Sequence, residues 1–194
     1  NTFTDTYGGI YATYYDALTI RGNTIVGSYM YDMGINLNYC DGANVIEDNH
    51  INAPDMSYGM YINNCQATSG NEATIANNLI NVEDHGIYFE YYNYYHNIFY
   101  NTIKVRDGYA LRIWNYSYNH NLKNNIFLTE ATSFPAVYFR YTNSVDSSDY
   151  NDFYSNYAYP IYASGNKTLA QWQATGQDSN SVSIDPIFNA DSSL

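Results

Sequence analysis

Asparagine recurs along this chain at near-constant intervals, and each of these asparagines is followed two residues later by an apolar side chain. Successive asparagines are 26, 29, 23, 24 and 26 residues apart. Such a period is typical of solenoids, in which one coil buries its apolar face only against the neighbouring coils. The pairs are Asn23/Ile25, Asn49/Ile51, Asn78/Ile80, Asn101/Ile103, Asn125/Phe127 and Asn151/Phe153.

A second short element precedes each asparagine, with apolar residues at its second and fourth positions and small or polar residues mostly at its first and third. This period of two predicts strands whose second and fourth side chains face a core and whose first and third face water. The elements are Gly9–Ala12, Gly34–Leu37, Gly59–Ile62, Gly86–Phe89, Ala110–Ile113, Ala136–Phe139 and Pro160–Ala163.

Short strands joined by tight turns at about 25 residues per circuit predict a parallel β-solenoid, with coils stacked at ~4.8 Å. The asparagines then lie at a corner of every coil. Asparagine tolerates a left-handed backbone, and its amide can both donate to and accept from the asparagine of the next coil. The asparagine column is therefore expected to be structural, because buried polar groups need partners.

Charge and composition exclude several classes of protein. The 194 residues include 7 Lys and Arg against 19 Asp and Glu, a net charge of −12, which repels a phosphate backbone. Nucleic acid is thus not an expected partner, and no apolar run is long enough for a membrane span. The 25 tyrosines, with few lysines and glutamates, favour an extracellular β-protein, secreted or at the cell surface.

The repeated Gly-Ile-Tyr and Asn-x-Ile elements resemble those of right-handed parallel β-helix repeat proteins with the pectin-lyase-like fold. The segments Thr168–Gln173 and Asp185–Phe188 resemble the closing part of large secreted or surface-exposed bacterial members. The resemblance implies an all-β, single-stranded right-handed parallel β-helix of about seven coils, followed by a short helix and an extended closing strand.

One domain over residues 1–194 is expected, with regular coils over 1–164 and a closing segment over 165–194. The first coil is already complete at Gly9, which suggests a fragment of a longer chain with flanking domains. Relatives include polysaccharide lyases, hydrolases, tailspikes and adhesins. The preferred hypothesis is a non-catalytic scaffold or adhesin segment that contacts glycans; a self-associating fibre or tailspike-like module is a further alternative, and the oligomeric state is left open.

The outward face of the second element gathers aromatic and charged side chains on neighbouring coils. Tyrosine and tryptophan rings can stack on sugars, and arginine can bind a uronate carboxylate with two hydrogen bonds. The preferred interpretation of these columns is a tyrosine ladder that only stabilises the sheet, with an Arg and a Glu paired between coils, because β-propensity alone produces aromatic columns of period two. The predicted ligand-binding residues are Tyr61, Tyr88, Glu90, Arg112, Trp114, Tyr138 and Arg140.

The same face supplies the candidate catalytic residues Glu90, Arg112 and Arg140, with Asp84 nearby in sequence. A lyase needs a base beside the uronate and a cation or Arg on its carboxylate, whereas a hydrolase needs two carboxylates across the cleft. The sequence signatures of pectate lyases, polygalacturonases and alginate epimerases are missing. A polysaccharide lyase or hydrolase on an acidic polysaccharide is therefore the alternative hypothesis.

His96, His120 and Asp146 each lie five residues before an asparagine, so they are expected in register on successive coils. Such a set could hold a transition metal, but a polar stack at a solvated edge is the preferred interpretation. No cofactor is predicted, although calcium is possible on so acidic a surface. Cys40 and Cys65 are stacked on consecutive coils, either as a disulfide or as two buried thiols.

Overall fold

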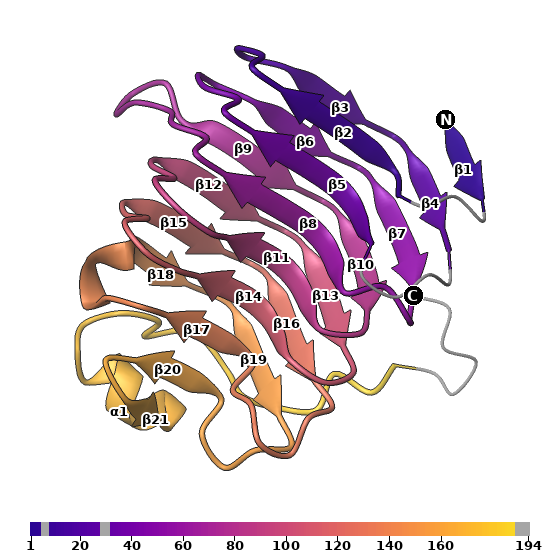
Figure 1. Ribbon diagram of the computed structural model, residues 1–194. Coiled ribbons are helices and arrows are strands. Elements are labelled where there is room, and N and C mark those ends of the chain that lie inside the picture. The colour runs from indigo at the N-terminus through magenta and orange to yellow at the C-terminus, as the bar shows by residue number, and fades with distance from the viewer. Residues whose placement is uncertain (5–7, 28–31, 189–194) are drawn as a thin grey trace.

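The computed structural model describes residues 1–4, 8–27 and 32–188. The chain winds into a right-handed parallel β-helix of about six turns, and each turn adds one strand to each of three sheets (Figure 1). Among the described residues there is one short α-helix, near the C-terminus, and a single 3₁₀ turn, η1 (Thr142–Ser144). The predicted all-β solenoid is confirmed, and its coil number agrees roughly with the seven expected.

The three sheets are named here by their place in Figure 1. The front sheet contains β2 (Ile10–Thr13), β5 (Met33–Asn38), β8 (Tyr58–Asn63), β11 (His85–Phe89), β14 (Tyr109–Ile113), β17 (Val137–Phe139), β20 (Ile161–Ala163) and the antiparallel β21 (Asn166–Lys167). The side sheet contains β1 (Thr2–Thr4), β4 (Thr24–Val26), β7 (His50–Ala53), β10 (Leu79–Val82), β13 (Thr102–Val105), β16 (Ile126–Thr129) and β19 (Asp152–Ser155). The back sheet contains β3 (Thr19–Arg21), β6 (Val45–Glu47), β9 (Ala73–Ala76), β12 (His96–Phe99), β15 (His120–Lys123) and β18 (Val145–Asp149).

The core is a set of vertical columns of like side chains. In the side sheet, the residue two after each ladder asparagine pairs with its equivalent on the next coil, and all of these side chains are buried. In the front sheet, the second and fourth positions of the repeated element are buried from Ile35 onward, as the alternation predicts. Burying these apolar side chains contributes about 1.5–3 kcal/mol each.

The first position of the front-sheet element was predicted to face water, and this is wrong. Gly34, Gly59, Gly86, Ala110 and Ala136 are all buried. A Cβ added at Gly86 would lie 2.1 Å from Cγ2 of Ile103 and 2.5 Å from the carbonyl oxygen of Ala110. The small residue is therefore required by the close approach of the next coil and of the side sheet.

The asparagine column forms a continuous ladder of hydrogen bonds through the interior. From Asn23 to Asn125, each side-chain amide donates to Oδ1 of the asparagine on the next coil, at 2.9–3.1 Å. The same Oδ1 also accepts from the backbone N–H of the preceding ladder asparagine, at 3.0–3.1 Å. Asn1 extends the ladder by donating to Asn23. The predicted amide ladder is thus confirmed.

The left-handed backbone lies one residue earlier than expected. Positive φ angles of 54–64° occur at the residue before each ladder asparagine, not at the asparagine itself. The ladder asparagine has to point its amide inward, and the turn that brings the chain around the corner is made just before it. The left-handed residues are Gly22, Asp48, Asn77, Tyr100, Asn124 and Tyr150.

The C-terminal segment closes the ladder with an aspartate. The Asp178 carboxylate accepts from the amide of Asn151 at 3.0 Å, from Trp172 Nε1 at 2.6 Å and from the Ser181 hydroxyl at 2.6 Å. Trp172 belongs to α1 (Leu169–Gln173) and packs on the Phe139 ring of the last complete coils. The short helix implied by the resemblance is confirmed, and its tryptophan anchors it to the core.

The extended strand implied for residues 185–188 is not formed: these residues pair with no other strand. Instead, the Asp185 carboxylate accepts from the backbone N–H of Ile187 at 3.0 Å. Just before them, Val182 forms a bridge with Asp152, the Ser183 hydroxyl donates to the carbonyl oxygen of Phe153 at 2.7 Å, and the backbone N–H of Ile184 donates to the Asp152 carboxylate at 3.1 Å. A local turn thus replaces the expected ladder bonds.

Replacing Asn101 by alanine is expected to lower the free energy of unfolding by about 3 kcal/mol, because donors and acceptors on both neighbouring coils lose their partner in the interior. Urea denaturation measures the change. Asn115→Ala is the control, since the Asn115 side chain makes no hydrogen bond with the described residues. Equal losses in the two variants would contradict a structural ladder.

Candidate functional site

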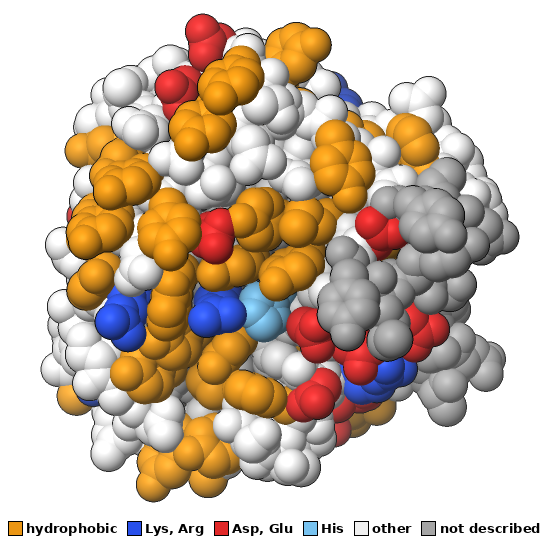
Figure 2. All heavy atoms as spheres, in the orientation of Figure 1, with side chains coloured by type: hydrophobic (Ala, Val, Ile, Leu, Met, Phe, Trp, Pro, Cys, Tyr) orange, Lys and Arg blue, Asp and Glu red, His pale blue; other side chains and the backbone are white. Residues whose placement is uncertain are grey.

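The front sheet carries an aromatic and charged surface on its outer side, which we name the aromatic–arginine face. Figure 2 shows apolar side chains across this side of the molecule, with basic, acidic and histidine side chains among them. The β-sheet register places the predicted ligand-binding residues on adjacent coils, as expected from their spacing. The face comprises Tyr58, Tyr61, His85, Tyr88, Glu90, Tyr109, Arg112, Trp114, Tyr138 and Arg140.

Arg112, on β14, lies at the centre of this face inside a cage of rings. The guanidinium carbon is 4.5 Å from the ring centroid of Trp114, 4.9 Å from Tyr88, 5.4 Å from Tyr109 and 5.7 Å from Tyr138. These distances allow cation–π attraction to several rings. The rings leave Arg112 only partly exposed, and its Nε is buried without a hydrogen-bond partner among the described residues.

His85 is the direct polar partner of Arg112, with Nη1 and Nε2 separated by 2.8 Å. Burial lowers the pKa of His85 to about 4, and the positive charge of Arg112 adds to this effect. The imidazole is therefore neutral at pH 7 and accepts from the guanidinium. His85 is not among the residues predicted from the sequence to form the site; the column Tyr58, His85 and Tyr109, in register on three coils, is the signal that places it in the face.

Glu90 follows β11 and accepts a hydrogen bond from the Tyr61 hydroxyl on the neighbouring coil. Burial raises its pKa, while Arg112 acts in the opposite direction. It forms no ion pair with Arg112 or Arg140: the ion pairs of the described residues are Arg21–Glu47, Lys104–Glu130, Arg106–Asp55 and Arg106–Glu83. The alternative of an inter-coil Arg–Glu pair on this face is therefore wrong.

Arg140 extends the charged part of the face by one coil. Its guanidinium carbon is 4.9 Å from the ring centroid of Trp114, so that ring lies within reach of both arginines. Tyr138 and Tyr162 stack beside it with centroids 4.3 Å apart. The arrangement offers two cations and a set of ring surfaces on consecutive coils.

The candidate carboxylates for hydrolysis are not brought together. Asp84 and Glu90 flank opposite ends of strand β11, and the five residues of extended chain between them put their backbones about 20 Å apart. Retaining and inverting hydrolases need carboxylates roughly 5–9.5 Å apart. Asp84 lies instead at the corner with Glu83 and Asp107; burial raises its pKa, and those two charges raise it further.

The predicted metal set is only partly assembled. His120 pairs with Val145, not with Asp146, because the register shifts by one residue between His120 and Asn121. The η1 turn and this bulge leave Asp146 exposed, where its backbone carbonyl accepts from Gln177. The expected solvated edge is also wrong for the histidines, since His96 and His120 are 2 % and 0 % exposed.

Among the described residues, no three or more His, Cys, Asp or Glu side chains form a group that could hold a metal ion. The His96/His120 pair supplies nitrogens only, and three of these nitrogens have no hydrogen-bond partner. A pair of imidazoles without a third donor does not match the three or four protein ligands of a zinc site or the oxygen ligands that calcium requires.

Cys40 and Cys65 are free, buried thiols. The Cys65 sulfur accepts from the backbone N–H of Cys40 at 3.4 Å, and the column continues with Asn93 and Ser117, which accept in the same way. Burial raises the pKa of Cys65 to about 12, which keeps the thiol protonated. The cysteines thus belong to a second ladder at another corner of the coils. As in the asparagine ladder, each side chain accepts a hydrogen bond from a backbone N–H of the preceding coil.

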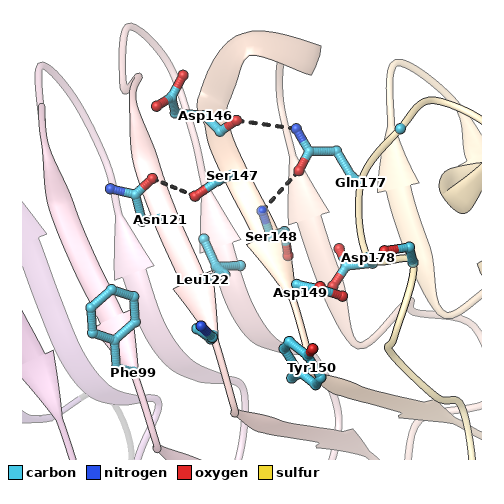
Figure 3. A pocket seen from close by; sticks show the side chains of 13 residues that line it. Phe99, Asn121, Leu122, Asp146, Ser147, Ser148, Asp149, Tyr150, Gln177 and Asp178 are labelled. Carbon is cyan, nitrogen blue, oxygen red and sulfur yellow. Dashed lines mark hydrogen bonds between the residues drawn. The ribbon is translucent and has the colours of Figure 1, made fainter.

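A hollow of about 500 Å³ lies over the back sheet beside the closing segment (Figure 3). The Ser147 hydroxyl donates to Asn121 at 2.7 Å, and Gln177 accepts from the backbone N–H of Ser148 at 2.8 Å. Asp149 accepts both from the side chain and from the backbone of Asn180. These polar groups are used to attach the closing segment to the coils, so the hollow is a structural junction.

Lowering the pH is expected to destabilise the protein partly through His85. Its folded pKa of about 4 lies below the usual 6.5, so the unfolded chain binds more protons between these values and stability is lost as the pH falls. From pH 7 to pH 5 the loss from this group is about 2 kcal/mol. Urea denaturation at the two pH values gives the free energy of unfolding of the wild type and of His85→Gln, and the variant should lose about 2 kcal/mol less than the wild type. Identical losses in the two proteins would contradict a neutral, buried His85.

Comparison with known proteins adds a family. A family model described as "Periplasmic copper-binding protein (NosD)" matches residues 1–185. No curated protein and no solved structure matches the chain. None of the helices in the described ranges is long and apolar enough to cross a membrane. Since the matched segment covers nearly the whole sequence and the fold is the expected β-helix, the chain belongs to the NosD family.

Proposed function

We propose that this chain is a non-catalytic β-helix module that binds an acidic glycan through its aromatic–arginine face. The observation that carries the proposal is Arg112, a partly buried guanidinium that is enclosed by aromatic rings and has no carboxylate within 4 Å among the described residues. A partly buried charge without a counter-charge at ion-pair distance is unfavourable. A ligand carboxylate would remove that cost, and it would find both Arg112 and Arg140 within the same face.

Charge distribution supports a ligand that touches only this region. The chain carries a net charge of −12, so a long polyanion lying over the whole surface would be repelled. The described ion pairs neutralise Arg21, Lys104 and Arg106, whereas Arg112 and Arg140 have no acidic partner within 4 Å. An acidic sugar bound across neighbouring coils would meet the two unpaired cations of the face.

The rings of the face suit sugar recognition. Trp114 and Tyr138 are in contact at 5.4 Å, and Tyr88 packs edge-on against Tyr61 at 5.7 Å. Tyr88 and Tyr138 are buried, whereas the partly exposed Tyr61 and Trp114 present flat apolar surfaces that can stack on the apolar faces of sugars. The neutral His85 and the Glu90 carboxylate add hydrogen-bonding groups at the edge of these rings. Most side chains of the face are already ordered by their mutual contacts, which limits the entropy lost on binding.

The family description adds two points to this proposal. Its word "periplasmic" agrees, at the level of a location in the cell envelope, with the secreted or surface location expected from composition. Its word "copper-binding" has no counterpart in a cluster of three or more donors in the described ranges. We therefore assign no metal to the aromatic–arginine face. The proposed role of the module is adhesion to glycans at a cell surface.

The alternative is a polysaccharide lyase on the same face. Arg112 or Arg140 would neutralise the uronate carboxylate, and Glu90 would take the neighbouring proton. The carboxylate–Tyr61 hydrogen bond and the absence of an ion pair leave Glu90 able to accept a proton. The two activities differ in one measurable product, since a lyase leaves a new unsaturated end.

Binding to a polyuronate such as polygalacturonate, but not to a neutral glucan, is the expected result in isothermal titration calorimetry. Arg112→Gln should weaken binding at least about tenfold, because a hydrogen bond to a charged group contributes about 1.5–3 kcal/mol and 1.4 kcal/mol is a factor of ten. Arg21→Gln is the control, since Arg21 lies on the back sheet and pairs with Glu47.

Equal binding of the neutral glucan, or unchanged binding by Arg112→Gln, would contradict the proposal. Incubation of the same polyuronate with the protein, followed by absorbance of unsaturated ends, tests the alternative. Product formation that stops in Arg112→Gln and persists in Arg21→Gln would establish a lyase and refute the non-catalytic module.

A further inference from the structure

The outer side of the front sheet changes in chemical character along the axis of the β-helix. One outward position is occupied in register on five successive coils by Asn38, Asn63, Glu90, Trp114 and Arg140, which we name the outer column. The backbone N–H of each of the last three donates to the preceding coil at 2.8–2.9 Å. With coils about 4.8 Å apart, the outer column is about 19 Å long. It runs from two amides, through one carboxylate, to a ring and a guanidinium.

The first part of the outer column is uncharged and forms hydrogen bonds. The Asn63 amide donates to Oδ1 of Asn38 at 3.2 Å, and the Asn38 amide donates to Oδ1 of Asn36 at 2.5 Å. All three side chains are partly exposed. A carboxamide has two N–H donors and an oxygen with two lone pairs, so these groups keep hydrogen-bonding capacity for the hydroxyls of a ligand. This end of the column suits an uncharged sugar.

The last part of the outer column is positively charged. The guanidinium carbons of Arg112 and Arg140 lie 4.5 Å and 4.9 Å from the ring centroid of Trp114. Neither arginine has a carboxylate within 4 Å in the described part of the chain. A sugar stacked on the partly exposed Trp114 would therefore have a guanidinium available for a carboxylate that it carries.

Glu90 lies between these two parts and is next to Trp114 in the column. Its carboxylate accepts a hydrogen bond from the hydroxyl of Tyr61, which belongs to the preceding coil and holds the charge on the amide side of the face. Like charges repel, and they do so more strongly at a partly buried site than in bulk water. A ligand carboxylate is thus favoured on the arginine side of Trp114 and disfavoured on the Glu90 side.

We infer that Glu90 determines the specificity of the face by rejecting a second acidic sugar. The ligand lies along the axis, with one acidic sugar at Trp114 and the two arginines. Uncharged sugars follow over Glu90 and over the amides of Asn63 and Asn38. The inference rests on the proposed glycan function and narrows it to glycans in which uncharged sugars separate the acidic ones, because a carboxylate on every sugar would place one beside Glu90.

Two galacturonan oligomers of equal length test this specificity, one with every carboxylate free and one partly methyl-esterified. They share a backbone and differ in charge. In isothermal titration calorimetry at low ionic strength, the wild type should bind the esterified oligomer about three- to tenfold more tightly. Glu90→Gln should bind the fully acidic oligomer more tightly by about the same factor and should bind the esterified oligomer within about twofold of the wild type. Added salt should reduce these differences, because it screens exposed charges.

Three variants serve as controls. Glu72→Gln removes the same charge from a loop that precedes the back-sheet strand β9, so it should affect the two oligomers equally. Tyr61→Phe removes the hydrogen bond to Glu90 and keeps the charge, so it should not improve binding of the fully acidic oligomer. Arg112→Gln should weaken binding of both oligomers, as the glycan function requires.

The outcomes separate this inference from the function on which it rests. Equal affinity of the wild type for the two oligomers, an equal change for both in Glu90→Gln, or the same gain in Glu72→Gln would overturn the role of Glu90. The glycan function would survive any of these results if Arg112→Gln still lost binding. No binding of either oligomer by the wild type, or unchanged binding by Arg112→Gln, would overturn both.

Discussion

The hydrogen bonds between coils at the asparagine corner are the interaction on which the rest of the structure depends. Each ladder oxygen accepts both the backbone N–H and the side-chain amide of the asparagine one coil earlier in the chain. A shift in register by one residue would break these bonds and turn the apolar columns outward. The ladder therefore sets the vertical alignment of the coils, and Asp178 ends it by taking the last amide.

The same alignment creates the surface chemistry. Because equivalent positions of successive coils lie directly above one another, side chains 24–29 residues apart become neighbours on the front sheet. The result is a partly buried guanidinium, Arg112, that contacts four rings and a neutral histidine and has no carboxylate within 4 Å in the described part of the chain. Partial burial without a close counter-charge is unfavourable for the free protein, and it is the reason to expect an acidic ligand there.

Much of the fold was predictable because a solenoid repeats one local pattern. The apolar columns, the amide ladder and the neighbours Tyr61, Tyr88 and Arg112 follow from spacing alone. The predictions failed where a feature depends on how closely two coils approach each other, or on a local irregularity such as a β-bulge. The first-position residues such as Gly86 are buried by close approach of the next coil, and Asp146 leaves its column through a bulge that spacing does not reveal.

The sequence by itself determined the architecture: the period set the coil, the alternation set the core face, and asparagine supplied a side chain that can satisfy a buried corner. Only the tertiary structure decided the electrostatic environment of individual side chains. Whether His85 is neutral, whether Glu90 pairs with an arginine, and whether His96 is exposed depend on packing from other coils, because solvation and charge partners are properties of three-dimensional neighbours.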